Sequence, residues 1–311
     1  LETDGGYELP RIEPGDTTGR TYGLAIDVGT TTCAIHLIDL AHNEILATGS
    51  DYNGQIPRGL DIISRINYAR TPERIEELRG LVIETLNGVI GGLCGQQNIS
   101  IDDLDSAAVA GNTTMIHLLL GLNPEYIRLD PYTPTVNRPP VVRAEELGLW
   151  MSPAGRVMFA PGVGSYVGGD ITSGLLISAL ATDDQAVRLF LDIGTNGEVV
   201  IGNNEWLMAC AASAGPAFEG SGVRCGMRAA RGAIERVQIN DNGQARIATV
   251  GDAPPRGICG SGMIDLLSEL WRAGLLDPSG KLVPSRSPFV RECPDSTRCL
   301  EYVVAPADDS D

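Results

Sequence analysis

The strongest constraint on the fold of this chain is an internal repeat. Leu24–Ile35 aligns without a gap on Leu189–Val200, and each copy contains the pattern Asp-x-Gly-Thr. An apolar run that ends in Asp, a Gly/Thr turn and a second apolar run predict a buried strand, a tight turn and a second strand. Two such hairpins, each followed by segments of helical periodicity, predict an α/β protein with two similar lobes.

Apolar patterns predict further elements after each hairpin. In the first half we expect strands at Cys33–Leu40, Glu44–Ser50, Ser106–Ala110 and Arg156–Ala160, and helices at Thr71–Gly92, Thr113–Leu120 and Gly168–Ala181. In the second half we expect strands at Glu198–Ile201, Trp206–Ala212, Glu235–Ile239 and Ala245–Val250, and a helix at Ser261–Ala273. The first long helix has three start signals, namely Thr71 as the cap, Pro72 at the first helical position and Glu73 in the first turn.

Composition divides the chain into a leading segment and two lobes. Residues 1–20 are rich in Gly, Pro, Thr and charge and begin with Leu1 rather than Met, which predicts a linker from a region upstream. We expect residues 21–185 to form lobe I and residues 186–311 to form lobe II, because each span opens with one copy of the repeat. With 311 residues and 43% hydrophobic content, the chain is long enough for two lobes.

The charge of the chain excludes some classes of partner. A formal net charge of -17 argues against tight binding to nucleic acid or to an anionic membrane, since both require clustered Lys and Arg. No apolar run approaches the roughly 20 residues that a bilayer-spanning helix needs. Seven scattered cysteines favour a reducing cytoplasm, and Cys293 and Cys299 form a poor metal-binding pattern. Small molecules and proteins are therefore the expected partners.

Each repeat offers the groups that a nucleotide triphosphate with its metal needs: backbone N–H donors, hydroxyls and a carboxylate. Asp27 and its equivalent Asp192 each end a strand, where their carboxylates are expected to hold Mg²⁺ through water. The predicted phosphate-binding residues are Gly29, Thr30, Thr31 and Thr32 in the first turn and Gly194, Thr195, Asn196 and Gly197 in the second. One such turn is common in ordinary hairpins, but two matched copies favour nucleotide binding.

Two glycine-rich segments of the second half are candidates for contacts with the rest of the nucleotide. The first precedes and opens an amphipathic helix, and its candidate residues are Gly257, Gly260, Ser261 and Gly262. A ring or ribose packs directly on such backbone, where N–H groups are available at the helix start. The alternative is an ordinary loop with Ser261 as a helix cap. The second, weaker candidate follows the strand at Trp206–Ala212 and contains Gly215 and Glu219.

The loop before the predicted helix at Gly168–Ala181 is a further candidate. Its spacing, G-x-G-x-x-x-G, misses the dinucleotide fingerprint, and no P-loop occurs in the chain. Asp170 in this loop is expected to lie in the nucleotide cleft and to orient the attacking water, with a helix cap as the alternative role. The three histidines do not form a metal set and are interpreted as structural, namely His36, His42 and His117.

Seven short segments carry a family resemblance: Ile26–Thr31, Ala110–Met115, Pro161–Gly164, Gly168–Asp170, Leu191–Glu198, Ala214–Gly220 and Gly257–Gly262. Together they resemble the ATPase domain of the reductive activators of corrinoid enzymes, within the superfamily of actin, sugar and acetate kinases and heat-shock chaperones. The resemblance implies duplicated ribonuclease-H-like lobes with a nucleotide cleft between them. It also implies that the family domain continues further, so that lobe II is expected to be incomplete at its C-terminus.

The resemblance also implies a function. The chain is expected to bind and hydrolyse ATP with Mg²⁺, using Asp27, Asp192 and Asp170 as catalytic residues, and to help return a Co(II) corrinoid protein to Co(I). A corrinoid (iron-sulfur) protein is the implied partner, and a homodimer is allowed. The 2Fe-2S cluster of such activators is expected only in an upstream domain, since no C-x4-C-x2-C run occurs here. Two other functions stay open: a sugar or carboxylic-acid kinase, and a scaffold protein whose assembly ATP controls.

Overall fold

The computed structural model describes residues 2–3, 6–7, 12, 14–181, 185–213, 223–293 and 296–306. They divide into two compact units. The first unit comprises Leu1–Asp192 and Gly197–Ala212, and the second comprises Ile193–Asn196 and Ser213–Asp311. Within the described ranges, no helix is both long and apolar enough to cross a membrane.

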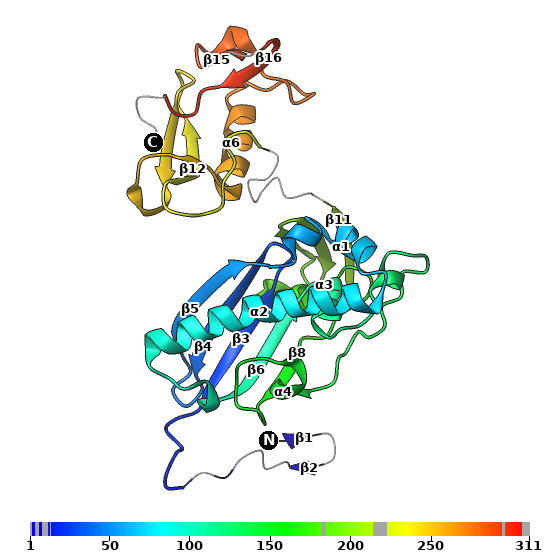
Figure 1. The fold of residues 1–311 in the computed structure, drawn as a ribbon. Coiled ribbons are helices and arrows are strands. Elements are labelled where there is room, and N and C mark those ends of the chain that lie inside the picture. Colours follow the sequence, from blue (N-terminus) through cyan, green and yellow to red (C-terminus); the bar gives the residue numbers. More distant parts are fainter. Residues whose placement is uncertain are drawn as a thin grey trace. The chain divides into compact units, whose positions relative to one another are not determined.

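The first unit is built on a six-stranded sheet in the order β5-β4-β3-β6-β8-β7 (Figure 1). The strands are β3 (Tyr22–Val28), β4 (Thr32–Asp39), β5 (Glu44–Tyr52), β6 (Leu104–Gly111), β7 (Val142–Arg143) and β8 (Arg156–Phe159). Strands β3, β4 and β5 form an antiparallel meander, whereas β3, β6 and β8 run parallel, with β7 antiparallel at the edge. The strands that the sequence predicts for the first half of the chain are thus confirmed. Two short strands, β1 (Glu2–Thr3) and β2 (Gly6–Tyr7), precede the sheet.

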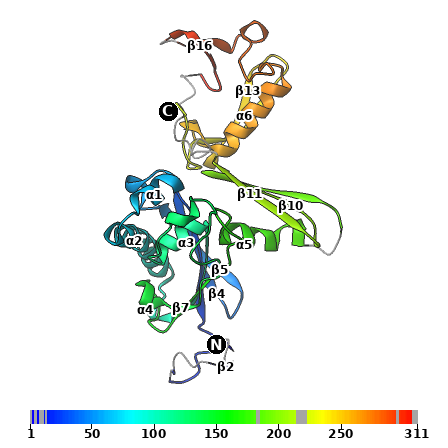
Figure 2. The ribbon, with the colours of Figure 1, turned by 90° about the vertical axis from the view of Figure 1, so that its right-hand side faces the viewer.

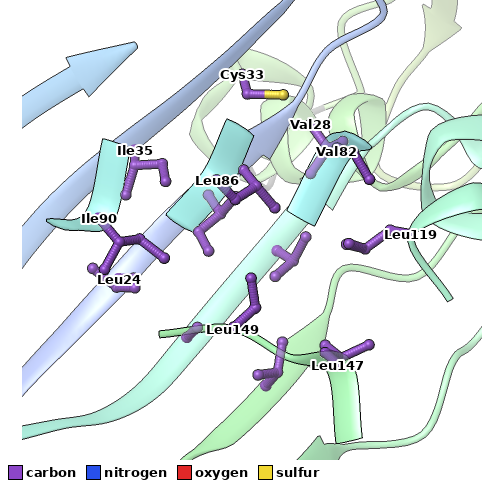
Figure 3. Close-up of a cluster of buried hydrophobic side chains, with 14 of the residues drawn as sticks. Leu24, Val28, Cys33, Ile35, Val82, Leu86, Ile90, Leu119, Leu147 and Leu149 are labelled. Carbon is purple, nitrogen blue, oxygen red and sulfur yellow. The ribbon is translucent and has the colours of Figure 1, made fainter. Parts of the chain in front are cut away.

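The main core lies between this sheet and helix α2 (Pro72–Gln97), which crosses one face of the sheet in Figure 1. On β3, Leu24, Ile26 and Val28 are buried against the helix, as Figure 3 shows for Leu24 and Val28. The helix contributes residues at helical spacing that are fully buried: Leu78, Val82, Leu86 and Ile90. Because strand side chains alternate, Asp27 lies on the opposite face of the sheet.

Helix α2 begins at the predicted position but ends later than predicted. Thr71 occupies the capping position, yet its side chain makes no capping hydrogen bond. The predicted end at Gly92 is wrong, because the helix continues and buries Leu93 and Cys94 in the core. It ends at Gln97, and the capping residue Asn98 adopts a left-handed conformation with φ 55°. Tertiary burial thus outweighs the weak helix propensity of the intervening glycines.

The remaining helices of the first unit are α1 (Ile62–Tyr68), α3 (Thr113–Leu119), α4 (Ala144–Leu147) and α5 (Gly169–Ile177). Helix α1 has no counterpart among the predicted elements. Helix α5 ends earlier than predicted, and a 3-10 turn at Ala179–Ala181 follows it. A three-stranded sheet comes next, in the order β11-β10-β9, with strands β9 (Arg188–Ile193), β10 (Asn196–Gly202) and β11 (Leu207–Ser213). Figure 2 shows α5 beside β10 and β11, where Ile171 and Val200 share a small core.

The second unit is a smaller α/β assembly. Strand β12 (Ala233–Ile239) pairs antiparallel with β13 (Ala245–Thr249) and parallel with β14 (Gly257–Ile258). Helix α6 (Gly260–Arg272) packs on β12, and Ile234, Val237 and Leu270 belong to their common core. A final hairpin consists of β15 (Val290–Cys293) and β16 (Ser296–Tyr302). Cys293 and Cys299, a poor metal pattern by sequence, form a disulfide in this hairpin.

Candidate functional site

The first Asp-x-Gly-Thr turn joins β3 to β4. Asp27 is paired with Ala34 on β4 and with Ala110 on β6, so small neighbours leave its carboxylate accessible. A cavity of about 530 Å³ lies over this face of the sheet, and Asp27 and His36 are among its lining residues. The N–H of Gly29 donates to the carbonyl of Thr32 at 3.0 Å and closes the turn. A Cβ at Gly29 would overlap with that carbonyl oxygen, so the turn requires glycine.

The second Asp-x-Gly-Thr turn joins β9 to β10 and closes one residue earlier. The N–H of Gly194 donates to the carbonyl of Asn196 at 2.8 Å, and β10 already begins at Asn196. Thr195 is buried, as is its equivalent Thr30 in the first turn. A Cβ at Gly197 would meet only the Ala212 carbonyl, at 3.8 Å, so this position has room for a side chain. Both predicted hairpins are therefore present, with different turn geometry.

The three predicted catalytic aspartates interact electrostatically within the first unit. Loss of hydration raises the pKa of Asp27 to about 6, and the charge of Asp192 adds to the rise. The pKa of Asp192 is raised by the same desolvation. Solvent still reaches both side chains, but neighbouring protein atoms displace part of their hydration. The charges of one aspartate from each repeat therefore influence one another, with desolvation as the larger effect on Asp27.

Asp170 is the third member of this group. It lies in the first turn of α5, where its Oδ1 accepts a hydrogen bond from the N–H of Ile171 at 2.8 Å. Burial raises the pKa of Asp170 to about 6, and the charges of Asp27 and Asp192 contribute to the rise. Asp170 therefore accepts a hydrogen bond in the first turn of its own helix and lies within electrostatic range of the two turn aspartates. Its predicted role toward the attacking water stays a prediction.

The site contains a fourth carboxylate, Glu198, that was not among the predicted site residues. Glu198 is buried near the start of β10, and loss of hydration raises its pKa to about 7, with contributions from the charges of Asp170 and Asp192. In the repeat it aligns with Cys33, a fully buried thiol. A carboxylate where the other copy has an apolar residue was the available sequence signal. We call Asp27, Asp170, Asp192 and Glu198 the carboxylate cluster.

The carboxylate cluster suits a hydrated cation better than a directly coordinated one. Four acidic groups with raised pKa values repel one another, and a nearby divalent cation would relieve that repulsion. Over the described part of the chain, no three His, Cys, Asp or Glu side chains converge closely enough to coordinate one metal ion. Mg²⁺ commonly keeps several waters and takes few protein ligands. The residues present therefore fit Mg²⁺ held through water.

The three histidines, interpreted as structural from the sequence, each have a polar partner within 2.9 Å. His117 is buried, and its Nδ1 lies 2.7 Å from the carbonyl oxygen of Thr113. His36 lies on β4 with its Nδ1 2.7 Å from Thr48 Oγ1. His42 pairs with Asp39 at the surface.

The predicted adenosine loop lies in the second unit. Gly262 packs against the Ile234 carbonyl, where a Cβ would overlap, and a Cβ at Gly257 would lie 2.8 Å from the Cys225 carbonyl. Close packing of α6 and β14 therefore accounts for two of its glycines. Ser261 is exposed in the first turn of α6, and the capping position is Cys259 rather than Ser261. Gly215 and Glu219 lie outside the described residues.

Fold and site together define a class of protein. The sheet has the order β5-β4-β3-β6-β8, and the acidic turn follows β3, the first of these strands in the chain. A second copy of that turn occurs later in the sequence. This is an α/β actin-like ATPase fold. Family models agree: one described as the RACo middle region matches residues 22–183, and one described as the C-terminal domain of RACo, the ASKHA domain, matches residues 186–311. The chain therefore belongs to the RACo family.

Individual relatives point the same way. The chain is 36% identical over 263 residues to the corrinoid activation enzyme RamQ of Eubacterium limosum, covering 84% of this chain and 44% of that protein. It is 25% identical over 301 residues to the Co(II) methylated amine-specific corrinoid protein reductase of Methanosarcina barkeri, covering 84% and 54%. A solved reductive activator for corrinoid, iron-sulfur protein is 50% identical, with a TM-score of 0.86 over 96% of this chain and 47% of that one. The chain thus spans about half the length of these relatives.

Proposed function

We propose that this chain is the ATP-binding and ATP-hydrolysing domain of a reductive activator that helps return a Co(II) corrinoid protein to Co(I). The observation that carries the proposal is the carboxylate cluster, in which the aspartates of both repeats interact with Asp170. The assignment to corrinoid reduction comes from the relatives, whose names describe corrinoid activation and Co(II) corrinoid reduction. The partner is accordingly a corrinoid (iron-sulfur) protein.

The two acidic turns would hold the nucleotide and its metal. Asp27 and Asp192 bind Mg²⁺ through water, and the turn residues Gly29–Thr32 and Gly194–Gly197 bind the β- and γ-phosphates. The adenosine would contact Gly257, Gly260, Ser261 and Gly262. When bound, Mg²⁺ neutralises charge on the triphosphate, whose cleavage provides the energy. Positioning and electrostatics then supply most of the catalysis.

Asp170 and Glu198 would act on the attacking water. Asp170 accepts a hydrogen bond from that water and orients it, while Glu198 accepts its proton. A buried carboxylate whose pKa is raised to about 7 is suited to accept a proton near neutral pH. Hydrolysis then changes the conformation of the domain, and the corrinoid protein responds to that change.

We place this activity in the cytoplasm. The exposed thiols of Cys210 and Cys225 fit a reducing compartment, where the Cys293–Cys299 disulfide would be open to reduction. Residues 21–185 and 186–311 would form the two lobes of the domain.

The test is ATP hydrolysis by the intact protein with and without a Co(II) corrinoid protein. We expect slow phosphate release that the corrinoid protein stimulates, and loss of both rates in Asp27→Asn. Phosphotransfer to a sugar or a carboxylic acid, with no stimulation by the corrinoid protein, would contradict the proposal in favour of a kinase. ATP-dependent sedimentation without stimulation would contradict it in favour of a scaffold protein.

A further inference from the structure

We propose that Arg65 and Asn53 are positioning residues that set the first acidic turn for phosphate binding. The inference deepens the proposed function and rests on it. Neither residue was among the predicted site residues, and both side chains are buried, Arg65 completely.

Three consecutive carbonyls of the turn accept hydrogen bonds from these two residues. The side-chain amide of Asn53 donates to the carbonyl of Gly29 at 2.9 Å, and its backbone N–H donates to the carbonyl of Thr31, also at 2.9 Å. Between them, Nη2 of Arg65 donates to the carbonyl of Thr30. Every peptide unit from Gly29 to Thr32 is therefore held by a donor from outside the turn.

This arrangement orients the N–H groups of the turn. In a trans peptide the C=O and the following N–H point in opposite directions. The carbonyls of Gly29, Thr30 and Thr31 point toward Asn53 and Arg65, so the N–H groups that follow them point away. N–H groups presented together in this manner form an anion-binding surface. A phosphate is the anion that the proposed function places there.

Arg65 is itself held in place by several partners. Its Nε donates to the Gly59 carbonyl and its Nη1 to Gln55 Oε1, both at 2.9 Å. Helix α1, which carries Arg65, starts with a reciprocal capping pair between Asp61 and Ser64. A planar guanidinium with these bonds holds a fixed orientation, which a flexible ammonium does not.

The charge of Arg65 acts on the same turn. Its field opposes the rise in the pKa of Cys33, the residue that follows the turn, whereas Asp27 adds to that rise. A positive charge behind the turn offsets the repulsion between Asp27 and an incoming phosphate. Arg65 therefore has two effects, one on the orientation of the turn and one on its potential.

The experiment compares MgATP and AMP affinities by calorimetry for the full 311-residue chain and its variants. AMP lacks the β- and γ-phosphates, so it reports binding that does not depend on the turn. We expect Arg65→Gln and Asn53→Ala to weaken MgATP about 10- to 100-fold and to change AMP affinity less than about twofold. Arg65→Lys, which keeps the charge, should lie between wild type and Arg65→Gln.

The matched control is Asn87→Ala. Asn87 is a buried amide on α2 that bonds the Gly148 carbonyl and the Trp150 N–H, so its loss disturbs the same unit away from the turn. It should lower stability and leave MgATP affinity unchanged. If Arg65→Gln does not fold, Asn53→Ala and Arg65→Lys still decide the question. MgATP and AMP weakened equally, or MgATP not weakened at all, would overturn the inference. Failure of the wild-type chain to bind MgATP would instead overturn the proposed function.

Discussion

The two acidic turns share one sequence pattern but differ in support and in the residue that follows. The first turn is held from behind by Arg65 and Asn53, and the fully buried thiol Cys33 follows it. The second turn closes one residue earlier, and the buried carboxylate Glu198 follows it. Under the proposed function, the first copy holds phosphate in a fixed geometry and the second adds a carboxylate that accepts a proton.

The largest expected effect comes from adding a methyl group to each turn. Gly29→Ala would drive a Cβ into the Thr32 carbonyl, whereas Gly197→Ala would meet its nearest atom at 3.8 Å. We expect Gly29→Ala to lose measurable MgATP binding and about 1–3 kcal/mol of stability. Gly197→Ala should change both only slightly. Calorimetry and thermal denaturation measure the two variants, and equal effects would contradict the different space available at these two glycines.

The next largest effect is expected from substituting Glu198, which follows the second turn, in comparison with Cys33, which follows the first. Glu198→Gln should lower ATP hydrolysis about 100-fold or more while MgATP still binds, because it removes the proton acceptor. Cys33→Ala should keep the hydrolysis rate and cost about 1–2 kcal/mol of stability, because it leaves a small cavity in the core. Single-turnover phosphate release is the measurement. A Glu198→Gln rate close to wild type would contradict the assignment of Glu198.

The smallest expected effect is on the pH dependence of stability. The folded-state pKa of Asp27 is raised to about 6 from 3.8, so the folded chain binds this proton more tightly than the unfolded chain does. The contribution of Asp27 to stability is therefore full below about pH 4 and is lost as the pH rises through about 6. Asp27→Asn removes this loss, so its melting temperature should exceed that of wild type by a margin that grows between pH 4 and pH 6. A margin that shrinks over this range would contradict the raised pKa of Asp27, which arises from desolvation and, to a smaller extent, from the charge of Asp192. Mg²⁺ should narrow the margin at pH 8.

Much of the first sheet was predictable because its signals are local. Alternating apolar residues and the repeated Asp-x-Gly-Thr pattern lie within a few residues of one another, and they placed β3, β4 and the turn aspartates correctly. The end of α2 was not predictable in the same way. Its glycines suggested a stop, but burial of Leu93 and Cys94 against the sheet extends the helix.

Arg65 and Glu198 were not predicted from the sequence, because their roles depend on contacts with residues distant in the chain. Arg65 is 35 residues from its partner Thr30, and nothing around it in sequence indicates complete burial. Glu198 lay within the repeat, but its significance depends on Asp170, which belongs to another helix. Gly257 and Gly262 differ from these missed residues, because they were predicted to contact a nucleotide and the structure shows that they also have a packing role.

Calorimetry of MgATP binding to Asp27→Ala and Asp192→Ala tests the central claim most directly. If the two aspartates act on one metal-bound nucleotide, each single variant should lose most of the affinity gained from Mg²⁺. The double variant should then be little worse than either single one, because the two effects are not additive for residues that share a partner. Affinity that is unchanged in both single variants, or that falls in only one of them, would contradict a site built from both turns.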